Sequence, residues 1–355
     1  MRREFIEEHD ILSSLKGLEI GPLDRPLINK AKNDTNNIFY LDYMSTEDLR
    51  VKYASDCSVN TKEIVNIDFV CANGELVDSV NGEVFDYIIA SHVIEHVPNL
   101  LKWLNDIEKI LKPGGVAIFV IPDKRFSFDI QRPITTFGQV LEDYFLKSSN
   151  PRISAVFDHF SSAMSINGAQ IWNGVIGDVE LTPLASGKIA FDNAINVHQE
   201  DQYFDVHVNI FTPWSFFEII KKAIQSDIIS LKVARFKDTD IGQIEFMVEL
   251  VKPKELDKED LLLSIPVLKF ETFLAPYMPQ VKKLSGAIGD LTKITERLQK
   301  EIESLRLKLQ HEQELNIRTK SELDFKQKTL DRKSVKIVLL VIHKLYNLFG
   351  LSKSG

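Results

Sequence analysis

An acidic residue and a glycine end the first apolar segment of the chain, and a second acid ends the next one. Gly17-Leu18-Glu19-Ile20-Gly21 has the pattern of a buried strand that closes on glycine, and Asp42 follows an apolar strand at 38–41. Glycine at such a turn lets the backbone approach a ligand closely. A carboxylate at the end of the second strand can accept both ribose hydroxyls of an adenosine. The spacing therefore predicts a site for an adenosine-bearing cofactor.

The residues after Gly21 argue against a dinucleotide. A pyrophosphate site would need G-x-G-x-x-G, so that the phosphates can sit at a helix N-terminus. Here the turn continues as Pro22-Leu23-Asp24-Arg25-Pro26, with an acid and without a second glycine. A cofactor without phosphates, carrying an ammonium and a sulfonium, fits this loop better.

Strands alternating with helices must position these residues. Apolar runs predict further strands at 64–70, 85–90, 116–121, 228–234 and 244–251. Helical spacing predicts helices at 1–16, 46–54, 99–111 and 213–223, the third of them stopped by Lys112-Pro113-Gly114-Gly115. Continuous apolar runs are typical of strands buried on both faces of a parallel sheet. We therefore predict an α/β fold with a doubly wound, mostly parallel sheet.

The same pattern divides the chain into segments. Residues 1–123 and 205–252 form the predicted core, and 124–204 interrupts it as an insertion rich in aromatic, Asn, Ser and His residues. Ligands of α/β sheets bind beyond the carboxyl ends of the strands, and the insertion leaves from such an end. We therefore expect it to be the substrate lid. A linker at 253–283, a coiled coil at 284–333 and an apolar, basic segment at 334–355 follow.

Several ordered pieces of residues 17–121 resemble the class I S-adenosylmethionine-dependent methyltransferase family, particularly its small bacterial members linked to surface-polysaccharide assembly. The pieces are Gly17–Pro22, Asp42, Phe85–Val97 and Leu111–Gly115. The resemblance implies a Rossmann-like fold and S-adenosyl-L-methionine as the cofactor. One departure is that the family's loop has a further glycine where this chain has Leu23 or Arg25.

The resemblance also implies a role for each matching residue. Glu19 and Gly21 would hold the methionine end of the cofactor, and Asp42 the ribose. The turn Ala72-Asn73-Gly74 would hold the adenine, and Ser91 and His92 would lie beneath the methionine.

Two histidines and a glutamate in His92-Val93-Ile94-Glu95-His96 would share one face of a helix. H-x-x-E-H occurs in zinc metalloproteases, but here it follows a buried parallel strand, which a protease does not explain. It also resembles the metal site of some class I methyltransferases, with His207 as a further ligand, although those relatives carry glutamate in place of His92. We favour a third interpretation without a metal, because Glu95-His96 is a common pair in the family and its histidine shapes the methionine pocket or positions the acceptor.

A hydroxyl acceptor must lose a proton during methyl transfer, which calls for a base. The candidates are His96, His159 and His207, and each of them can instead have a packing or surface role. We favour His207, because it closely precedes the helix at 213 and so lies near the strand ends. Lys124 and Arg125 can meet an anionic acceptor, but the expectation is that they are solvated.

Composition limits the partners and the compartment. The 355 residues are 44% hydrophobic with a net charge of −8, which argues against nucleic acid as a partner. Cys57 and Cys71 have neither metal-ligand nor disulfide spacing, so we expect a cytoplasmic protein. The first ten residues lack the apolar run of a signal peptide, and the apolar stretch 335–351 is shorter than the ~20 residues of a membrane span.

The C-terminal part has the spacing of a coiled coil. Its seam residues are three and four apart: Ile288, Leu291, Thr295, Leu298, Ile302, Leu305 and Leu309. The seam can form a homo-oligomer or pack on the enzyme domain. Basic residues flank the apolar segment at 334–351, which predicts contact with the inner face of the membrane or with a partner protein.

Together these features predict a methyltransferase that methylates oxygen on a small-molecule or carbohydrate acceptor, a sugar or glycan of cell-surface polysaccharide assembly. Polar and aromatic residues of the insertion favour a sugar, namely Trp172, Asn173, Asn193, Gln199 and Tyr203. The alternatives are a methyltransferase for a quinone or amine, and an inactive scaffold that acts through its coiled coil.

Overall fold

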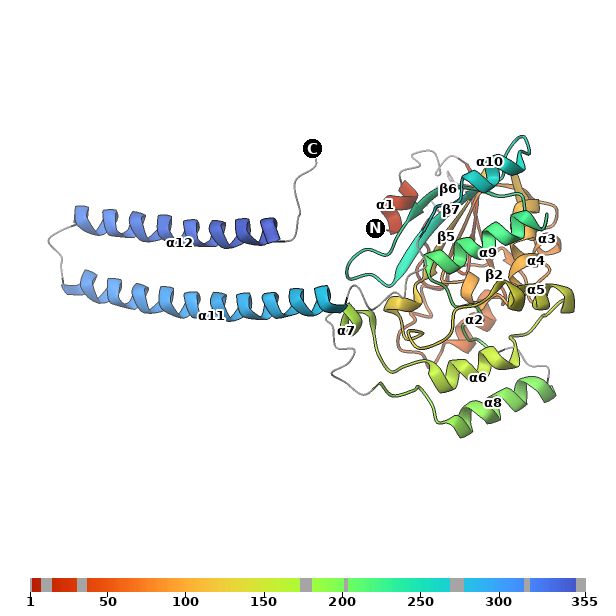
Figure 1. Ribbon diagram of the computed structural model, residues 1–355, viewed down its shortest axis with the longest axis horizontal. Coiled ribbons are helices and arrows are strands. Elements are labelled where there is room, and N and C mark those ends of the chain that lie inside the picture. Colours follow the sequence, from red (N-terminus) through yellow and green to blue (C-terminus); the bar gives the residue numbers. More distant parts are fainter. Residues whose placement is uncertain are drawn as a thin grey trace. The chain divides into compact units, whose positions relative to one another are not determined.

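The computed structural model describes residues 2–7, 15–30, 37–172, 181–200, 204–268, 278–315 and 320–348. The chain divides into two compact units, Met1–Lys282 and Lys283–Gly355, and we describe each by itself. The first unit contains a seven-stranded sheet flanked by helices (Figure 1).

The strand order of the sheet is β3-β2-β1-β4-β5-β7-β6. Strand β7 runs antiparallel to the other six strands, which are all parallel to one another. The prediction of a doubly wound, mostly parallel sheet is therefore confirmed. The strands are Lys16–Ile20 (β1), Asn37–Asp42 (β2), Phe69–Val70 (β3), Phe85–Ser91 (β4), Leu111–Pro122 (β5), Lys232–Lys237 (β6) and Glu245–Val251 (β7).

Helices cover the two faces of the sheet and form the insertion. Those of the first unit are Arg2–Glu7 (α1), Thr46–Lys52 (α2), Leu76–Ser79 (α3), Leu100–Ile110 (α4), Phe137–Leu146 (α5), Ile153–Ser162 (α6), Gly168–Trp172 (α7), Gly187–Glu200 (α8), Pro213–Gln225 (α9) and Lys258–Leu263 (α10). Two short 3₁₀ turns follow strands, Ile94–His96 (η2) after β4 and Lys124–Phe126 (η3) after β5.

Alternate side chains of the strands enter two separate cores. In β4, Ile88 and Ala90 pack with α4, α5 and α9, whereas Tyr87 and Ile89 pack with Phe5 and Ile6 of α1. Every one of these side chains is buried, as expected for a strand whose successive residues point to opposite faces of a covered sheet. The residues at 85–90 are therefore apolar because the strand is buried on both faces of the sheet, as the sequence predicted.

Three boundaries differ from the sequence prediction. The strand expected at 64–70 is confined to Phe69–Val70, because the Asp68 carboxylate accepts a hydrogen bond from the Tyr40 amide and so occupies a ladder position. The turn at 112–115 lies inside β5, because Gly114 and Gly115 exchange backbone hydrogen bonds with Lys252. The strand expected at 228–234 begins only at Lys232.

The first helix and the first crossover also differ from expectation. Helix α1 ends at Glu7, residues 8–14 lie outside the described residues, and Lys16 already belongs to β1. Between β1 and β2 the described residues 21–30 form turns and no helix. No helix N-terminus therefore follows Gly21 within this described stretch.

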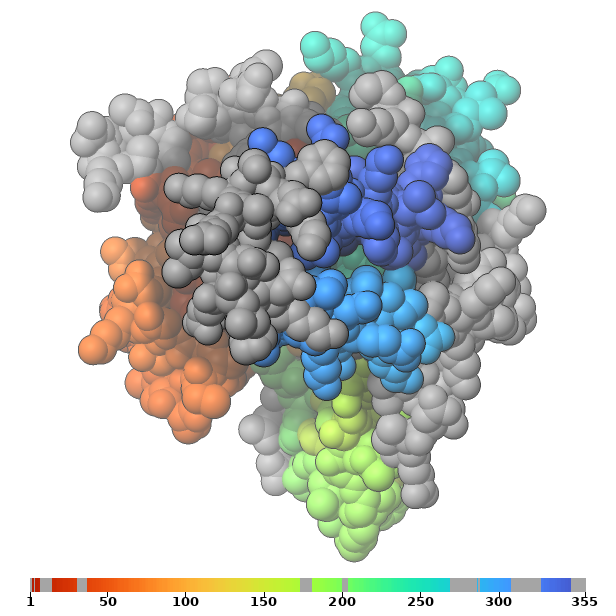
Figure 2. All heavy atoms as spheres, turned by 90° about the vertical axis from the view of Figure 1, so that its left-hand side faces the viewer, coloured from red at the N-terminus to blue at the C-terminus, as the bar shows by residue number. Residues whose placement is uncertain are grey.

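The insertion is helical and falls into two parts. Helix α5 starts with a capping box at Thr136 and packs Val140 into the core beside α4 and α9. Helices α6 and α8 pack on each other and share a smaller cluster with Val206 and Val208. Figure 2 shows this pair as the green spheres that project at the bottom of the first unit. Within the predicted lid, α6 and α8 are thus the helices that stand apart from the main core.

The second unit contains most of helix α11 (Met278–Leu315) and all of α12 (Lys320–Leu348). Partly covered positions recur with heptad-like spacing on both helices, at Leu291, Leu298, Ile302 and Leu305 and at Leu330, Ser334, Val341 and Leu345. Val335, Ile337 and Val338 are among several exposed apolar residues of α12. No helix among the described residues has the length and apolar character needed to cross a membrane. Coiled-coil pairing and membrane or partner contact remain predictions.

Replacing Gly17 in β1 tests the packing of the sheet. A Cβ atom there would overlap the ring of the buried Tyr87 on the adjacent strand, so Gly17→Ala should lower the free energy of unfolding by about 1–3 kcal/mol. In the matched control Gly138→Ala in α5, the new methyl group would meet only Thr136 Oγ1, 3.9 Å away, so stability should be unchanged or slightly higher. Urea denaturation measures both, and equal effects would contradict the proposed overlap.

Candidate functional site

The candidate site lies where the strand order reverses, between β1 and β4. Ligands of doubly wound sheets bind at this point, beyond the carboxyl ends of the strands. A cleft of about 200 Å³ opens there, and Glu19, Gly21, Ser91 and His92 are among its lining residues. These four predicted cofactor residues are therefore brought together by the pairing of the two strands.

Glu19 has a positioning role in addition to lining the cleft. Its Oε1 accepts a hydrogen bond from the Leu27 amide (2.7 Å) and its Oε2 one from the Ile28 amide (3.1 Å). Burial raises the pKa of Glu19 to about 7, although the two amides favour the charged form. The carboxylate thus holds the far end of the 21–28 loop against β1, and Leu27 also lines the cleft.

The loop after β1 places two residues in the left-handed region. Gly21 has φ +68°, and an added Cβ there would lie 2.7 Å from Val93 Cγ2. Leu23 has φ +47°, which is unusual for a residue with a side chain. Leu23 therefore adopts backbone geometry that usually requires glycine, at one of the two positions where the family has its further glycine.

Asp42 ends β2 and is buried, with Oδ1 accepting a hydrogen bond from the Tyr43 amide (2.8 Å). Burial raises the pKa of Asp42 to about 6. Ala72, Asn73 and Gly74 form an exposed turn after β3, in which Gly74 has φ +72°. Neither Asp42 nor this turn lines the cleft, although both lie at the carboxyl edge of the sheet.

The prediction that His92 shares a helical face with Glu95 and His96 is wrong. His92 has φ +55°, and only Ile94–His96 forms a 3₁₀ turn. The backbone turns at His92 because its amide still donates to Val120 in β5 (3.0 Å). The ring therefore points into the cleft, where Nε2 lies 2.8 Å from Glu245 Oε2 and 3.1 Å from Arg2 Nη2.

Glu245 anchors this side of the cleft. Burial would raise its pKa, but hydrogen bonds from His92 and Arg2 outweigh that effect and lower the pKa of Glu245 to about 2. Arg2 also lines the cleft, so helix α1 contributes to the site. Sequence reasoning missed Arg2 and Glu245, because they are 243 positions apart and no motif connects them.

His96 and His207 meet beside the buried Glu95. Their rings lie edge to face with centroids 4.8 Å apart, and the Nε2 atom of each lies 3.9 Å from Glu95 Oε1. The structure thus brings two of the three candidate bases together. His92 Nδ1 lies 3.5 Å from the same oxygen, so this group adjoins the cofactor cleft.

Carboxylates flank both rings on their other side. His207 Nδ1 lies 2.5 Å from Asp129 Oδ2, and His96 Nδ1 lies 3.0 Å from Asp205 Oδ1. Burial would lower the pKa of His96, but Asp205 and Glu95 raise it. The hydrogen bond with His96 lowers the pKa of Asp205. Sequence reasoning missed both acids, and the only available signal was Asp205 two positions before His207.

His159 of α6, the third candidate base, lies at the edge of this group. Its ring centroid is 6.4 Å from that of His207 and 6.1 Å from that of Phe128. Burial, with Arg132 nearby, lowers the pKa of His159 to about 4. The ring is therefore neutral near pH 7 and a weak base.

The expectation that Arg125 is solvated is wrong, because this residue is buried and bonded to Asp123 and Asp238. Lys124 is partly buried, and its Nζ donates to the Ile130 carbonyl. Trp172 stacks on Phe126 with centroids 4.1 Å apart. Its ring is therefore engaged within the protein. Asn193 and Gln199 lie on α8, and Asn173 and Tyr203 lie outside the described residues.

A family model described as a methyltransferase domain matches residues 12–161. This range holds β1 to β5, the cleft residues from Glu19 to His92, and the pair Glu95-His96. A comparison with curated proteins found no match.

Solved methyltransferase structures are similar to this chain at low sequence identity. The CcbJ methyltransferase from Streptomyces caelestis is 10% identical, over 70% of this chain and 88% of the other, with a TM-score of 0.36. Magnesium protoporphyrin IX methyltransferase from Synechocystis, with bound SAH, is 10% identical over 71% and 80%, with a TM-score of 0.32. An O-methyltransferase family protein from Burkholderia thailandensis is 11% identical over 71% of this chain and 55% of its own length, with a TM-score of 0.33.

The assignment therefore depends on the family match and on the observed fold, since TM-scores this low carry no argument. The strand order places the turns after β1 and β4 beside one cleft at the reversal point, where doubly wound sheets bind ligands. Residues 12–161 therefore match a methyltransferase domain in both sequence and fold.

Proposed function

We propose that S-adenosylmethionine binds across the carboxyl ends of β1, β2 and β4. The cleft beside Glu19, Gly21 and Ser91 takes the methionine end, Asp42 accepts the ribose hydroxyls, and the turn at 72–74 contacts the adenine. The supporting observation is the cleft itself, which two of the predicted turns line. The cleft is lined by the acids Glu19 and Asp24 and by the arginines Arg2 and Arg25, which suit the ammonium and the carboxylate of the methionine end.

We further propose that the acceptor is a polar compound methylated at a hydroxyl, such as a sugar or glycan of surface-polysaccharide assembly. The observation that carries this proposal is the buried polar group next to the cleft, in which Glu95 lies between His92 and the pair His96–His207. A quinone or another apolar acceptor would leave these buried polar atoms unpaired, which is unfavourable.

In the reaction the acceptor oxygen bonds to the methyl carbon as the carbon–sulfur bond breaks, and the hydroxyl proton leaves the oxygen. The sulfonium is already a strong electrophile, so alignment of the oxygen accounts for much of the rate. Removal of the proton needs a group near the oxygen. The histidine and carboxylate group beside the cleft meets that need through its ring nitrogens and the Glu95 oxygens.

The pH dependence of cofactor affinity tests the role of Asp42. An ionised carboxylate accepts two hydroxyl hydrogens, so affinity should fall as pH drops through about 6, by at most about tenfold per pH unit. Asp42→Asn should weaken binding roughly 10- to 100-fold at pH 7 and should lose this component of the pH dependence. Calorimetry from pH 5 to 8 measures both proteins. If wild type and Asp42→Asn had the same affinity at every pH, Asp42 would not contact the cofactor.

Gly21→Ala tests the loop. The new Cβ meets Val93 in the turn after β4, and the left-handed backbone adds about 1–2 kcal/mol of strain, so cofactor affinity should fall at least about tenfold. Gly82→Ala is the matched control, because Gly82 has φ +77° and nothing within 4 Å of the added atom. Both variants should lose stability in urea through the shared backbone strain, Gly21→Ala somewhat more because of Val93, and only Gly21→Ala should lose affinity. Equal affinities would show that the loop does not contact the cofactor.

Transfer of a labelled methyl group tests the acceptor. Sugars, nucleotide sugars and glycans should be methylated at oxygen, whereas quinones and amines should not. His207→Gln should lower the rate about 10²- to 10⁴-fold with cofactor affinity within about twofold, and the exposed His198→Gln should leave the rate unchanged. Product formed only with a quinone or amine would refute the acceptor class. Failure of the folded protein to bind the cofactor would favour the scaffold alternative.

A further inference from the structure

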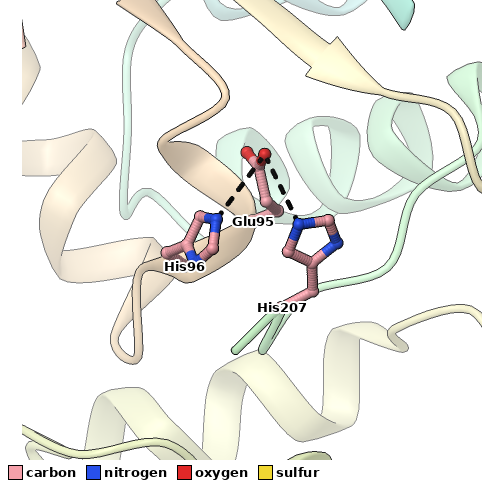
Figure 3. A group of neighbouring side chains, drawn as sticks. All are labelled: Glu95, His96 and His207. Atoms are coloured by element: carbon pink, nitrogen blue, oxygen red, sulfur yellow. Dashed lines mark ion pairs between the residues drawn. The ribbon is translucent and has the colours of Figure 1, made fainter. Parts of the chain in front are cut away.

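The group formed by Glu95, His96 and His207 is held by the backbone as well as by packing (Figure 3). The Glu95 carbonyl accepts hydrogen bonds from the amides of Val208 (2.7 Å) and Asn209 (2.9 Å). These bonds fix the segment before α9 against the turn after β4. One ligand atom from each of the three side chains then lies within 4.8 Å of the others.

The Glu95 carboxylate has no hydrogen-bond partner among the described residues. Its side chain is 0% exposed, and neither oxygen is paired. The nearest ring nitrogens are His92 Nδ1 at 3.5 Å and Nε2 of His96 and of His207 at 3.9 Å, and all three are too far for a hydrogen bond. Buried charges in proteins are paired or coordinate metals.

A carboxylate lies next to Nδ1 of each ring, on the side away from Glu95, and so orients Nε2 toward Glu95. Asp129 lies 2.5 Å from His207 Nδ1, and Asp205 lies 3.0 Å from His96 Nδ1. A proton held at Nδ1 by such a carboxylate leaves the lone pair on Nε2, as in the outer shell of many histidine metal sites. The inner nitrogens therefore face the carboxylate as potential ligands.

Other cations already neutralise the two outer acids. Arg132 Nη1 lies 2.8 Å from Asp129 Oδ1, and Lys52 Nζ lies 2.6 Å from Asp205 Oδ2. No such cation contacts Glu95 among the described residues, where its only ionic neighbours within 4 Å are histidines. A bound cation would therefore supply the partner that the Glu95 carboxylate lacks.

We propose that Glu95, His96 and His207 bind one divalent transition-metal ion. Two imidazole nitrogens and one carboxylate favour ions such as Mn²⁺, Fe²⁺, Co²⁺ or Zn²⁺ over Mg²⁺ and Ca²⁺, and leave coordination positions open. Metal–ligand distances of about 2.0–2.2 Å require ligand atoms about 3–3.5 Å apart. Each histidine Nε2 is 3.9 Å from Glu95 Oε1 and the three ligand atoms lie within 4.8 Å of one another, so binding requires side-chain rotations that bring them closer.

His92 stands outside this set of ligands. Its Nε2 is engaged by Glu245 and Arg2, and the group with mutually close ligand atoms consists of the other three residues. The site therefore differs from the four-residue set His92, Glu95, His96 and His207 considered from the sequence. Its open coordination positions are available to other ligands.

The ion would act on the acceptor, and this part of the inference rests on the proposed function. Adjacent hydroxyls of a sugar would occupy two open positions, and the cation would lower the pKa of a bound hydroxyl, whose proton would pass to the Glu95 oxygen that does not bind the ion. The sugar oxygen then bonds to the methyl carbon with the same balance of atoms as above. Binding of the ion itself does not depend on the acceptor.

Metal titration of the chelator-treated full-length protein tests the site. Loss of the free Mn²⁺ signal in electron paramagnetic resonance, and the visible bands of Co²⁺, should each show one equivalent bound. Glu95→Gln and His207→Gln should weaken binding at least about 100-fold, and Asp129→Asn about 10- to 100-fold. His198→Gln, an exposed histidine on α8, should bind as the wild type does.

Thermal melting and cofactor calorimetry establish that each variant is folded. Should a ligand variant unfold, the wild-type stoichiometry and the Asp129→Asn titration still decide the question. Absence of a stoichiometric ion in the wild type, or wild-type affinity in folded Glu95→Gln and His207→Gln, would overturn the inference. A protein that binds Mn²⁺ but methylates no sugar refutes only the acceptor class, whereas undiminished sugar methylation without metal refutes the role of the ion.

Discussion

Backbone pairing of β1 with β4 runs in parallel register from Gly17–Tyr87 to Ile20–Ala90. On its other side β1 pairs with β2 and β4 pairs with β5. The sheet therefore extends in one direction from β1 and in the opposite direction from β4. The two turns that follow, at Gly21 and at Ser91–His92, therefore meet at one edge of the sheet. The cleft, the buried histidines and the polar contacts of Glu245 all adjoin these turns. The absence of a side chain at Gly17 lets Tyr87 pack at the start of this pairing.

Burial of acids is the second constraint on the site. Burial raises the pKa values of Glu19 and Asp42, and hydrogen bonds from backbone amides limit that rise. Glu245 forms hydrogen bonds with Arg2 and His92, which keep its pKa low. Glu95 has histidine neighbours but no hydrogen-bond partner among the described residues, and this difference is the basis for inferring a metal ion.

The sequence errors have a common physical origin. The expectation that Arg125 is solvated assumed that polar residues of an insertion face solvent. In the structure Arg125 is paired in the interior and Trp172 packs on Phe126. Local patterns do not reveal such partners, because Asp238 and Gln243 come from the loop between β6 and β7.

Local sequence patterns predicted the succession of strands and helices around the sheet, the two-sided burial of β4, and the turns that follow Glu19 and Asp42. These features follow from periodicity and from turn residues, which act over short stretches of chain. Only the tertiary structure decided that His92 turns into the cleft, that Arg2 reaches Glu245, and that His96 and His207 meet at Glu95 with Asp205 and Asp129 behind them. Those contacts join residues up to 243 positions apart, and their geometry depends on the folded sheet, which no local pattern encodes.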